Sequence, residues 1–295
     1  MDKGYKRFLF IISDENMKSV ELYTQLEKDF IRSGMMDNWI DQMKNKRFLS
    51  DNFKHRSMGV VCDNSNEIKR VYTAVFPTDA ILRRVAKTRD SLLFLHHPES
   101  WDISKDPVFQ EMNQELLGRL KSHRVSIYNL HLALDNFSQY STSTTLAKKL
   151  GITDLKPFAL FNGSNVGVFG KTRLRTINAL SRVFERVVKH RISLYAYGNS
   201  KIRKGLIAVV AGGGNNKGVI QKVAGLGINT FVSGITVLNA YSKKTHIFAK
   251  RHRINILGGT HYSTEKFACI EMCKYFRKLG LPSKFIAGKP GFDDL

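Results

Sequence analysis

Short apolar segments with the character of β-strands alternate with amphipathic helical segments along this chain, and this alternation limits the possible folds most. Strands are predicted at 58–63, 70–77, 91–98, 125–130, 158–169, 192–197, 228–234 and 254–259, with a strand-loop-helix unit at 206–227. Helices are predicted at 15–33, 79–89, 107–122, 143–150, 175–189, 237–250 and 264–279, and 34–57 as a loop or short helical insertion. Such alternation is typical of α/β layers with largely parallel or mixed sheets. The long crossovers favour two similar α/β lobes with mixed sheets, 1–155 and 156–295, within a single domain 1–295.

The compartment is predicted from the apolar and cysteine patterns. No stretch approaches the roughly 18–20 apolar residues of a membrane-spanning helix. The short apolar patch near the start is interrupted by Ser13, Asp14 and Glu15 before a signal-peptide core could form. The three cysteines, Cys62, Cys269 and Cys273, match neither a disulfide framework nor a CxxC zinc site, and packing explains the last two. We therefore expect a soluble, cytoplasmic protein without a membrane partner.

The chain carries a large excess of positive charge. Lys and Arg number 47 against 25 Asp and Glu, a formal net charge of +22. One cluster between 171 and 204 has ten basic residues and one acid: Lys171, Arg173, Arg175, Arg182, Arg186, Lys189, Arg191, Lys201, Arg203 and Lys204, with Glu185. A second contains Lys243, Lys244, Lys250, Arg251 and Arg253. Such clusters attract nucleotides or nucleic acid, although a solvated basic helix face or a generally basic proteome explains them equally well.

Three pairs of residues that can bind metals stand where apolar runs end. They are His96 with His97, His131 with Asp135, and His261 with Glu265. Four imidazoles and two carboxylates exceed the needs of one tetrahedral zinc and suit two ions that share a bridging ligand. The pattern therefore indicates a dinuclear metal centre.

Each pair also has a structural interpretation. Adjacent histidines could be one packed and one exposed residue, unless the strand ends there, as Pro98 favours. Asp135 could cap a turn. We expect Ser263 or Thr264 to cap a helix, with His261 just before it and Glu265 in its first turn, within reach of the same ion. Glu265 could instead compensate the dipole at the helix start.

In order and context, the three segments resemble one known family. The segments HHP at 96–98, HLALD at 131–135 and GGTHYSTE at 258–265 are similar to those of the GTP cyclohydrolase I type 2 homologues. These are also called Nif-three-like dinuclear metal centre hexameric proteins. The resemblance extends over about 15–285. The chain differs from the family pattern at Ile235, where an acidic residue is usual, and at Asn215 and Asn216, where small polar residues are usual.

The resemblance implies a ligand set and an assembly. In such a site His96 and His261 would bind one divalent ion, His97 and Asp135 the other, and Glu265 would bridge them. His131 would lie beside the site, behind the ligands or as an occasional ligand. The family fold would put this site in the cleft between the two lobes, and six chains would form a homohexamer, a dimer of trimers. Mixed nitrogen and oxygen ligands suit zinc, iron, manganese, cobalt or nickel.

Two functions are consistent with these features. The first is a metal-dependent hydrolase that acts on a nucleotide or another phosphate-containing substrate, with GTP cyclohydrolase-like chemistry implied by the resemblance alone. The second is a non-catalytic, basic, metal-containing ring that binds nucleic acid or a protein partner. Salt separates them, because binding through phosphate contacts weakens steeply as salt rises.

Overall fold

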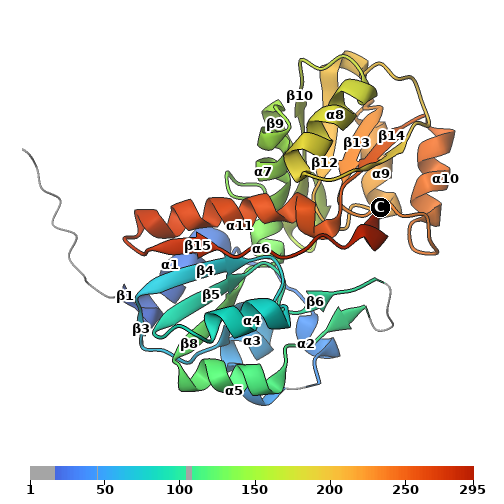
Figure 1. The fold of residues 1–295 in the computed structure, drawn as a ribbon. Helices are drawn as coiled ribbons and strands as arrows, with labels where there is room; N and C mark the ends of the chain where they lie inside the picture. The colour runs from blue at the N-terminus through green and yellow to red at the C-terminus, as the bar shows by residue number, and fades with distance from the viewer. Residues whose placement is uncertain (1–16, 45, 104–107) are drawn as a thin grey trace, which may run out of the picture.

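The computed structural model describes residues 17–44, 46–103 and 108–295. Two α/β lobes lie one above the other in Figure 1, and the long helix α11, His261–Lys278, runs between them. Both main sheets combine parallel and antiparallel pairs. The predicted α/β fold with mixed sheets is therefore confirmed.

The first sheet has five strands in the order β15-β4-β5-β8-β2. Its strands are β15 (Ser283–Phe285), β4 (Arg70–Ala74), β5 (Ser91–Leu95), β8 (Val125–Asn129) and β2 (Gly59–Cys62). All neighbours pair in parallel except β2 with β8. The buried side chains of β5 and β8 face helices on both sides, which explains why their sequences are continuously apolar.

The second sheet has six strands in the order β11-β14-β13-β12-β10-β9. Its strands are β11 (Ser193–Tyr195), β14 (Asn255–Gly258), β13 (Thr230–Ser233), β12 (Leu206–Val210), β10 (Ser164–Lys171) and β9 (Thr153–Phe161). The three central strands β12, β13 and β14 are parallel, and the outer strands are antiparallel to their neighbours.

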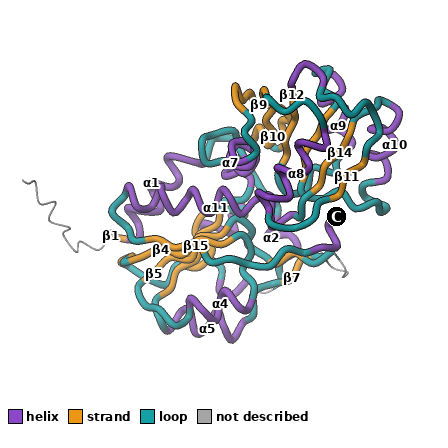
Figure 2. Tube along the Cα trace, turned by 45° about the horizontal axis from the view of Figure 1, so that its top comes forward, coloured by secondary structure: helices purple, strands orange, loops and turns teal. Residues whose placement is uncertain are grey.

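Helices cover both faces of each sheet. The other α-helices are α1 (Ser19–Phe30), α2 (Trp39–Gln42), α3 (Asp51–Arg56), α4 (Asp79–Val85), α5 (Gln114–Ser122), α6 (Leu132–Asp135), α7 (Thr142–Lys149), α8 (Ile177–Val188), α9 (Lys217–Gly225) and α10 (Lys243–Arg251). Short elements complete the fold: strands β1 (Met17–Lys18), β3 (Glu67–Ile68), β6 (Ser100–Trp101) and β7 (Phe109–Gln110), and 3-10 turns η1 (Lys46–Phe48), η2 (Arg203–Gly205) and η3 (Phe292–Asp294). Figure 2 shows α4 and α5 on one face of the first sheet and α1 and α11 on the other.

Helix α11 belongs to the cores of both lobes. Its Met272 and Phe276 pack with α1 and the first sheet, while Phe267 packs with α7, α8 and the second sheet. After α11 the chain returns to the first sheet as β15, which pairs with β4. The expected division at 155/156 falls inside β9 and stays a prediction.

Three predicted elements needed correction. The strand predicted at 158–169 is a hairpin, β9 and β10, because Asn162 and Gly163 both adopt positive φ, 42° and 81°, and reverse the chain. The helix predicted at 107–122 begins only at Gln114, where the Asn113 side chain accepts from the amides of Glu115 and Leu116. The helix predicted at 237–250 begins at Lys243.

Among the described residues, no helix is both long enough and apolar enough to cross a membrane. The interrupted apolar patch at the start of the chain lies outside the described residues. All three cysteines are buried and unpaired, as the packing interpretation of Cys269 and Cys273 predicted.

Candidate metal centre

The carboxyl-terminal ends of the parallel strands in both sheets face one another, and the predicted ligands lie between them. His96 and His97 follow β5, and their amides continue the ladder by donating to the carbonyls of Ala74 and Val75, at 3.2 and 2.9 Å. His131 comes shortly after β8, separated from the strand by Leu130 alone. Ligand sites at the carboxyl edge of parallel strands are a general property of open α/β sheets.

The start of α11 brings His261 and Glu265 to the same place. Thr260 is the N-cap: its side chain accepts from the amide of Ser263, whose side chain in turn accepts from the amide of Thr260. The expectation that Ser263 or Thr264 caps the helix, with His261 before it, was therefore wrong. His261 is the first helical residue, so Glu265 lies one turn later on the same face.

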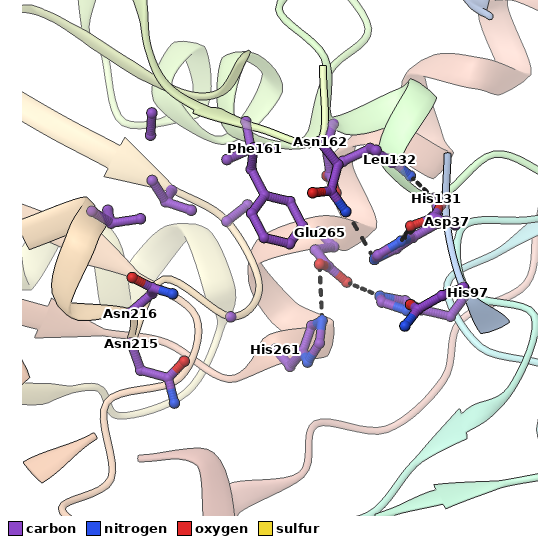
Figure 3. Close-up of a pocket in the computed structure, with 18 of the residues that line it drawn as sticks. Asp37, His97, His131, Leu132, Phe161, Asn162, Asn215, Asn216, His261 and Glu265 are labelled. Carbon is purple, nitrogen blue, oxygen red and sulfur yellow. Dashed lines mark hydrogen bonds and ion pairs between the residues drawn. The ribbon is translucent and has the colours of Figure 1, made fainter. Parts of the chain in front are cut away.

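The six predicted residues converge. Glu265 Oε1 lies 2.9 Å from His261 Nε2 and 3.4 Å from His96 Nε2, and its Oε2 lies 3.0 Å from His97 Nε2. Asp135 Oδ1 lies 3.6 Å from His96 Nε2. His131 Nε2 lies 4.0 Å from Asp135 Oδ2. Figure 3 shows Glu265 between His261 and His97.

Possible ligand atoms fall into three groups that share members. One contains His97, His261 and Glu265, a second His96, Asp135 and Glu265, and a third His96, His97 and His131. Glu265 is common to the first two groups, as a bridging carboxylate would be. The grouping joins His96 with Asp135 and His97 with His261, which differs from the pairing that the resemblance implied.

The residues present fit bound cations. His96 Nδ1 donates to the carbonyl of Leu130 at 3.1 Å, so its buried Nε2 presents a lone pair to two carboxylates and has no hydrogen-bond partner. An acceptor that faces only acceptors requires a proton or a metal ion between them. The backbone bond on the other nitrogen is the support that metal-binding histidines usually have.

Burial and the neighbouring charges shift the pKa values of the residues in the cluster. Burial opposes protonation of His96, but the carboxylates of Glu265 and Asp135 outweigh it and raise its pKa to about 9. Burial would raise the pKa of Glu265, yet His261, His97 and His96 hold it well below the usual range. Burial lowers the pKa of His97 well below its usual value. Burial raises the pKa of Asp135, so the cluster favours a charged Glu265 with a positive charge beside it.

A glycine lets the second lobe reach the ligands. Gly212, in the loop after β12, has φ +69°, and a Cβ there would collide with Glu265 Oε1. Its amide donates to Thr264 Oγ1 at 3.0 Å. The loop Gly212–Asn216 thus begins directly against the Glu265 carboxylate.

A comparison of the sequence with known families identifies the group to which this fold and site belong. A model of the Duf34/NIF3 (NGG1p interacting factor 3) family matches residues 38–287. The chain belongs to this Duf34/NIF3 family. The resemblance predicted from three short segments is confirmed.

Relatives within the family are distant. A "GTP cyclohydrolase 1 type 2 homolog" of Buchnera aphidicola is 24% identical over 236 residues, 78% of this chain and 89% of that protein. A protein of Archaeoglobus fulgidus with the same name is 26% identical over 248 residues, 81% of this chain and 95% of its own.

Solved structures share the Duf34/NIF3 fold with this chain. TTHA1606 from Thermus thermophilus matches with a TM-score of 0.70 at 18% identity, over 94% of this chain and 100% of its own. Reduced HcgD from Methanocaldococcus jannaschii matches with a TM-score of 0.67 at 21% identity, over 93% and 99%.

Asp37 was missed by the sequence analysis of this family member. Its carboxylate lies 3.2 Å from His131 Nδ1 and accepts from the amide of Leu132 at 3.2 Å. Burial opposes the charge on His131, but Asp37 more than compensates and raises its pKa. Asp37 lies in the segment 34–57, which was predicted as a loop or short helical insertion, and His131 lies 94 positions later. No local sequence pattern could therefore have indicated this contact.

Asp294 was missed for the same reason. This buried carboxylate accepts from the amide of His261 at 2.8 Å, and its carbonyl accepts from the amides of Thr236 and Val237. The end of the chain thereby supports the first turn of α11.

The cluster of possible metal ligands lies in the wall of a cavity of about 500 Å³. On one side the cavity is bounded by Asp37, Trp39, Trp101 and Phe109 from the first lobe. On the other it is bounded by the β9–β10 hairpin, the glycine-rich loop and the first turns of α9. The site is thus accessible to a small molecule.

Proposed function

We propose that this protein holds two divalent ions in the cluster and is a hydrolase for a nucleotide or another phosphate-containing substrate. The observation that supports the proposal most is the buried Glu265 carboxylate, shared by two separate groups of ligand atoms in the wall of a substrate-sized cavity. A single structural ion would need only one such group.

Each ligand residue of the cluster would have its own role in holding the ions. His97 and His261 would hold one ion, His96 and Asp135 the other, and Glu265 both. When bound, the ions would polarise a phosphoryl oxygen and lower the pKa of a water molecule. Zinc, iron, manganese, cobalt and nickel all suit this mixture of ligands.

His131 is proposed as the residue that takes a proton from the attacking water. Its Nδ1 faces both the Asp37 carboxylate, at 3.2 Å, and the indole N–H of Trp39, at 3.3 Å, so its Nε2 is directed toward the side of the cluster where Asp135 lies. Asp37 acts on the reaction through this imidazole, as a positioning residue. A histidine oriented by a carboxylate in this way is a common general base.

The test is hydrolysis by protein that has been stripped with a chelator and reloaded with each candidate ion in turn. The probes are p-nitrophenyl phosphate and a panel of nucleoside mono- and triphosphates, including GTP with its ring-opening followed by absorbance. We expect metal-dependent release of product from at least one probe and its loss in Glu265→Ala. Equal rates in the stripped and reloaded protein would contradict the proposal.

A second candidate function, binding of nucleic acid, is favoured by the exposed basic residues. All members of both basic clusters are exposed, and within the described ranges only Lys171 forms an ion pair, with Asp154 at 3.1 Å. Several lie near the amino-terminal ends of β12 and β14. The backbone next to Arg175 pairs there with the backbone at Lys201, and Gly198 packs against the Arg253 carbonyl. This is the end of the sheet away from the metal cluster.

Binding of a fluorescent single-stranded RNA across a salt series tests this second function. We expect affinity at low salt to fall steeply as salt rises, because phosphate contacts release counterions. The double variant Arg203→Glu, Lys204→Glu should weaken binding, while Lys54→Glu, outside the clusters, should not. Absence of binding at low salt would leave the basic residues as a solvated surface.

A further inference from the structure

The cavity extends beyond the metal ligands into an arm between the β9–β10 hairpin and α9. Leu160, Phe161 and Val166 bound the arm on the hairpin side. Asn215, Asn216, Gly218, Val219 and Lys222 bound it on the other side. None of these residues is in the cluster, so the metal centre leaves their chemistry unexplained.

The hairpin presents an aromatic ring to this arm. Phe161 is 53% exposed although it lines the cavity, and its neighbour Leu160 is 62% exposed. In Figure 3 the ring of Phe161 lies between Glu265 and the pair Asn215 and Asn216. An exposed aromatic face at the mouth of a cavity offers a stacking surface for a flat ring.

The position of the ring is fixed by the fold. The hairpin turn abuts the first lobe, since a Cβ on Gly163 would lie 3.0 Å from the carbonyl oxygen of Gly34. The following strand is fixed as well: the Asn165 amide donates to the side-chain Oδ1 of Asn136, and the Asn165 carbonyl accepts from the amide of Phe137, both at 3.0 Å. Phe161 is therefore held over the cavity by the second sheet, to which its hairpin belongs, and by these contacts with the first lobe.

Carboxamides line the arm at Asn215 and the adjoining part of the cavity at Asn162. The side chains of Asn162 and Asn215 make no hydrogen bond within the described part of the chain, while the Asn215 carbonyl accepts from Thr245 Oγ1 at 2.6 Å and holds the loop. A carboxamide offers a donor beside an acceptor. That pairing matches the edge of a purine, as asparagine does with adenine in nucleic-acid recognition.

None of the described residues that bound the arm is acidic. The acidic residues that line the cavity, Asp37, Asp135 and Glu265, all belong to the cluster or to its support. Ile235 is buried beside the glycine-rich loop, where a Cβ on Gly213 would lie 3.9 Å from its Cδ1. Lys222 is the one charged side chain among the described residues of the arm, and the rest of the surface bears amides and an aromatic ring, which suit a flat heterocycle.

We propose that this arm binds the base of a purine nucleotide, stacked on Phe161 and hydrogen-bonded by Asn215, with the phosphate directed to the metal cluster. The inference rests on the proposed function for the identity of the site. It adds the part of the substrate that the protein recognises and the residues that recognise it.

Nucleoside binding tests the arm without the metal. Adenosine and guanosine, which lack phosphate, are titrated into chelator-treated protein by calorimetry, with ribose 5-phosphate as the probe that lacks a base. Quenching of intrinsic fluorescence reports where they bind, because both tryptophans of the chain, Trp39 and Trp101, line this cavity.

We expect at least one purine nucleoside to bind and to quench this fluorescence. Phe161→Ala should weaken the binding about tenfold, the loss that removal of one base–aromatic stack usually causes. Phe161→Tyr, which keeps the ring, should bind as the wild type does. So should Tyr241→Ala, which removes an exposed ring outside the cavity.

Two results would overturn the inference: no nucleoside binding by the wild type, or equal binding by wild type and Phe161→Ala. Either result, with metal-dependent hydrolysis of p-nitrophenyl phosphate intact, would remove the base subsite and leave the hydrolase. The opposite outcome, nucleoside binding without any metal-dependent hydrolysis, would support the subsite and remove the proposed reaction.

Discussion

The buried Nε2 of His96 faces Glu265 and Asp135 at 3.4 and 3.6 Å while its other nitrogen donates to a backbone carbonyl. Candidate metal ligands can be recognised in a sequence because histidine and carboxylate side chains can bind metal ions in any fold. Which ligands share an ion depends instead on ångström-scale distances between segments far apart in the chain. The six predicted residues therefore do come together, but His96 is grouped with Asp135 and His97 with His261, which the resemblance did not imply.

Asp37 provides the first prediction at this scale. Asp37→Asn keeps the size of the side chain but removes the charge that holds His131, so activity should fall roughly 10- to 100-fold, as is usual for residues that orient a metal-site histidine. Metal content, measured by mass spectrometry, should stay near that of the wild type, and the pH profile of the rate should shift. Asp41→Asn, an exposed change nearby in α2, is the control. Wild-type activity and an unchanged profile in Asp37→Asn would show that Asp37 has no role in orienting His131.

Glu99 provides a second prediction, for stability against pH. Burial, with a smaller effect of Glu111, raises the pKa of Glu99 from 4.5 to about 7 despite a hydrogen bond from Gln42. The folded state then binds more protons than the unfolded state, so this group makes stability fall as pH rises from about 4.5 to about 7. Glu99→Gln cannot ionise and so avoids this loss of stability at high pH. Its Tm should exceed that of the wild type above pH 7 and differ little from it near pH 4.5. Chelator-treated protein avoids effects of bound ions, and a constant Tm difference across this range would contradict the prediction.

The β9–β10 hairpin is the element that the sequence analysis misread. Its two strands are both rich in apolar and aromatic residues, which favoured one long strand over 158–169. The Asn-Gly pair between them is a strong turn signal, because a tight hairpin turn needs positive φ at both central residues. The turn could thus have been predicted from the sequence, whereas the position of Phe161 over the cavity depends on contacts with the first lobe.

Replacement of Gly163 tests how tightly that turn is built. Alanine at φ +81° is strained, and its Cβ would press on the Gly34 carbonyl, so Gly163→Ala should lower the free energy of unfolding by about 1–2 kcal/mol. Chemical denaturation measures the change. Gly225→Ala, at a glycine with open space around it, should cost nothing. A Gly163→Ala protein as stable as wild type would mean that the turn relaxes freely.

At the scale of the whole molecule, α11 connects the lobes and carries two of the ligands. The alternation of strands and helices predicted both sheets, but it could not predict that the last strand, β15, returns to the first sheet. That return is a long-range pairing that no local pattern specifies. It places α11 in both cores and aligns His261 and Glu265 with the histidines of the first lobe.

Cooperative unfolding is the expected consequence. Phe276 is fully buried in the first-lobe core, with its ring 5.4 Å from that of Phe94. Phe276→Ala should lower the free energy of unfolding by about 3–5 kcal/mol. Tryptophan fluorescence, which reports the cavity, and circular dichroism, which reports both lobes, should still give one coincident transition. Two separate transitions would show that the lobes unfold independently.

The homohexamer implied by the resemblance stays a prediction. Sedimentation velocity of the full chain gives its mass directly, and a monomer at micromolar concentration would contradict it.

The most direct test of the metal centre is the number of ions per chain, in wild type and in Glu265→Ala, on protein purified without chelators. About two divalent ions in the wild type and a clear loss in the variant are expected, since the carboxylate belongs to both ligand groups. Wild-type protein without bound metal under these conditions would contradict the dinuclear centre and the hydrolase proposed from it.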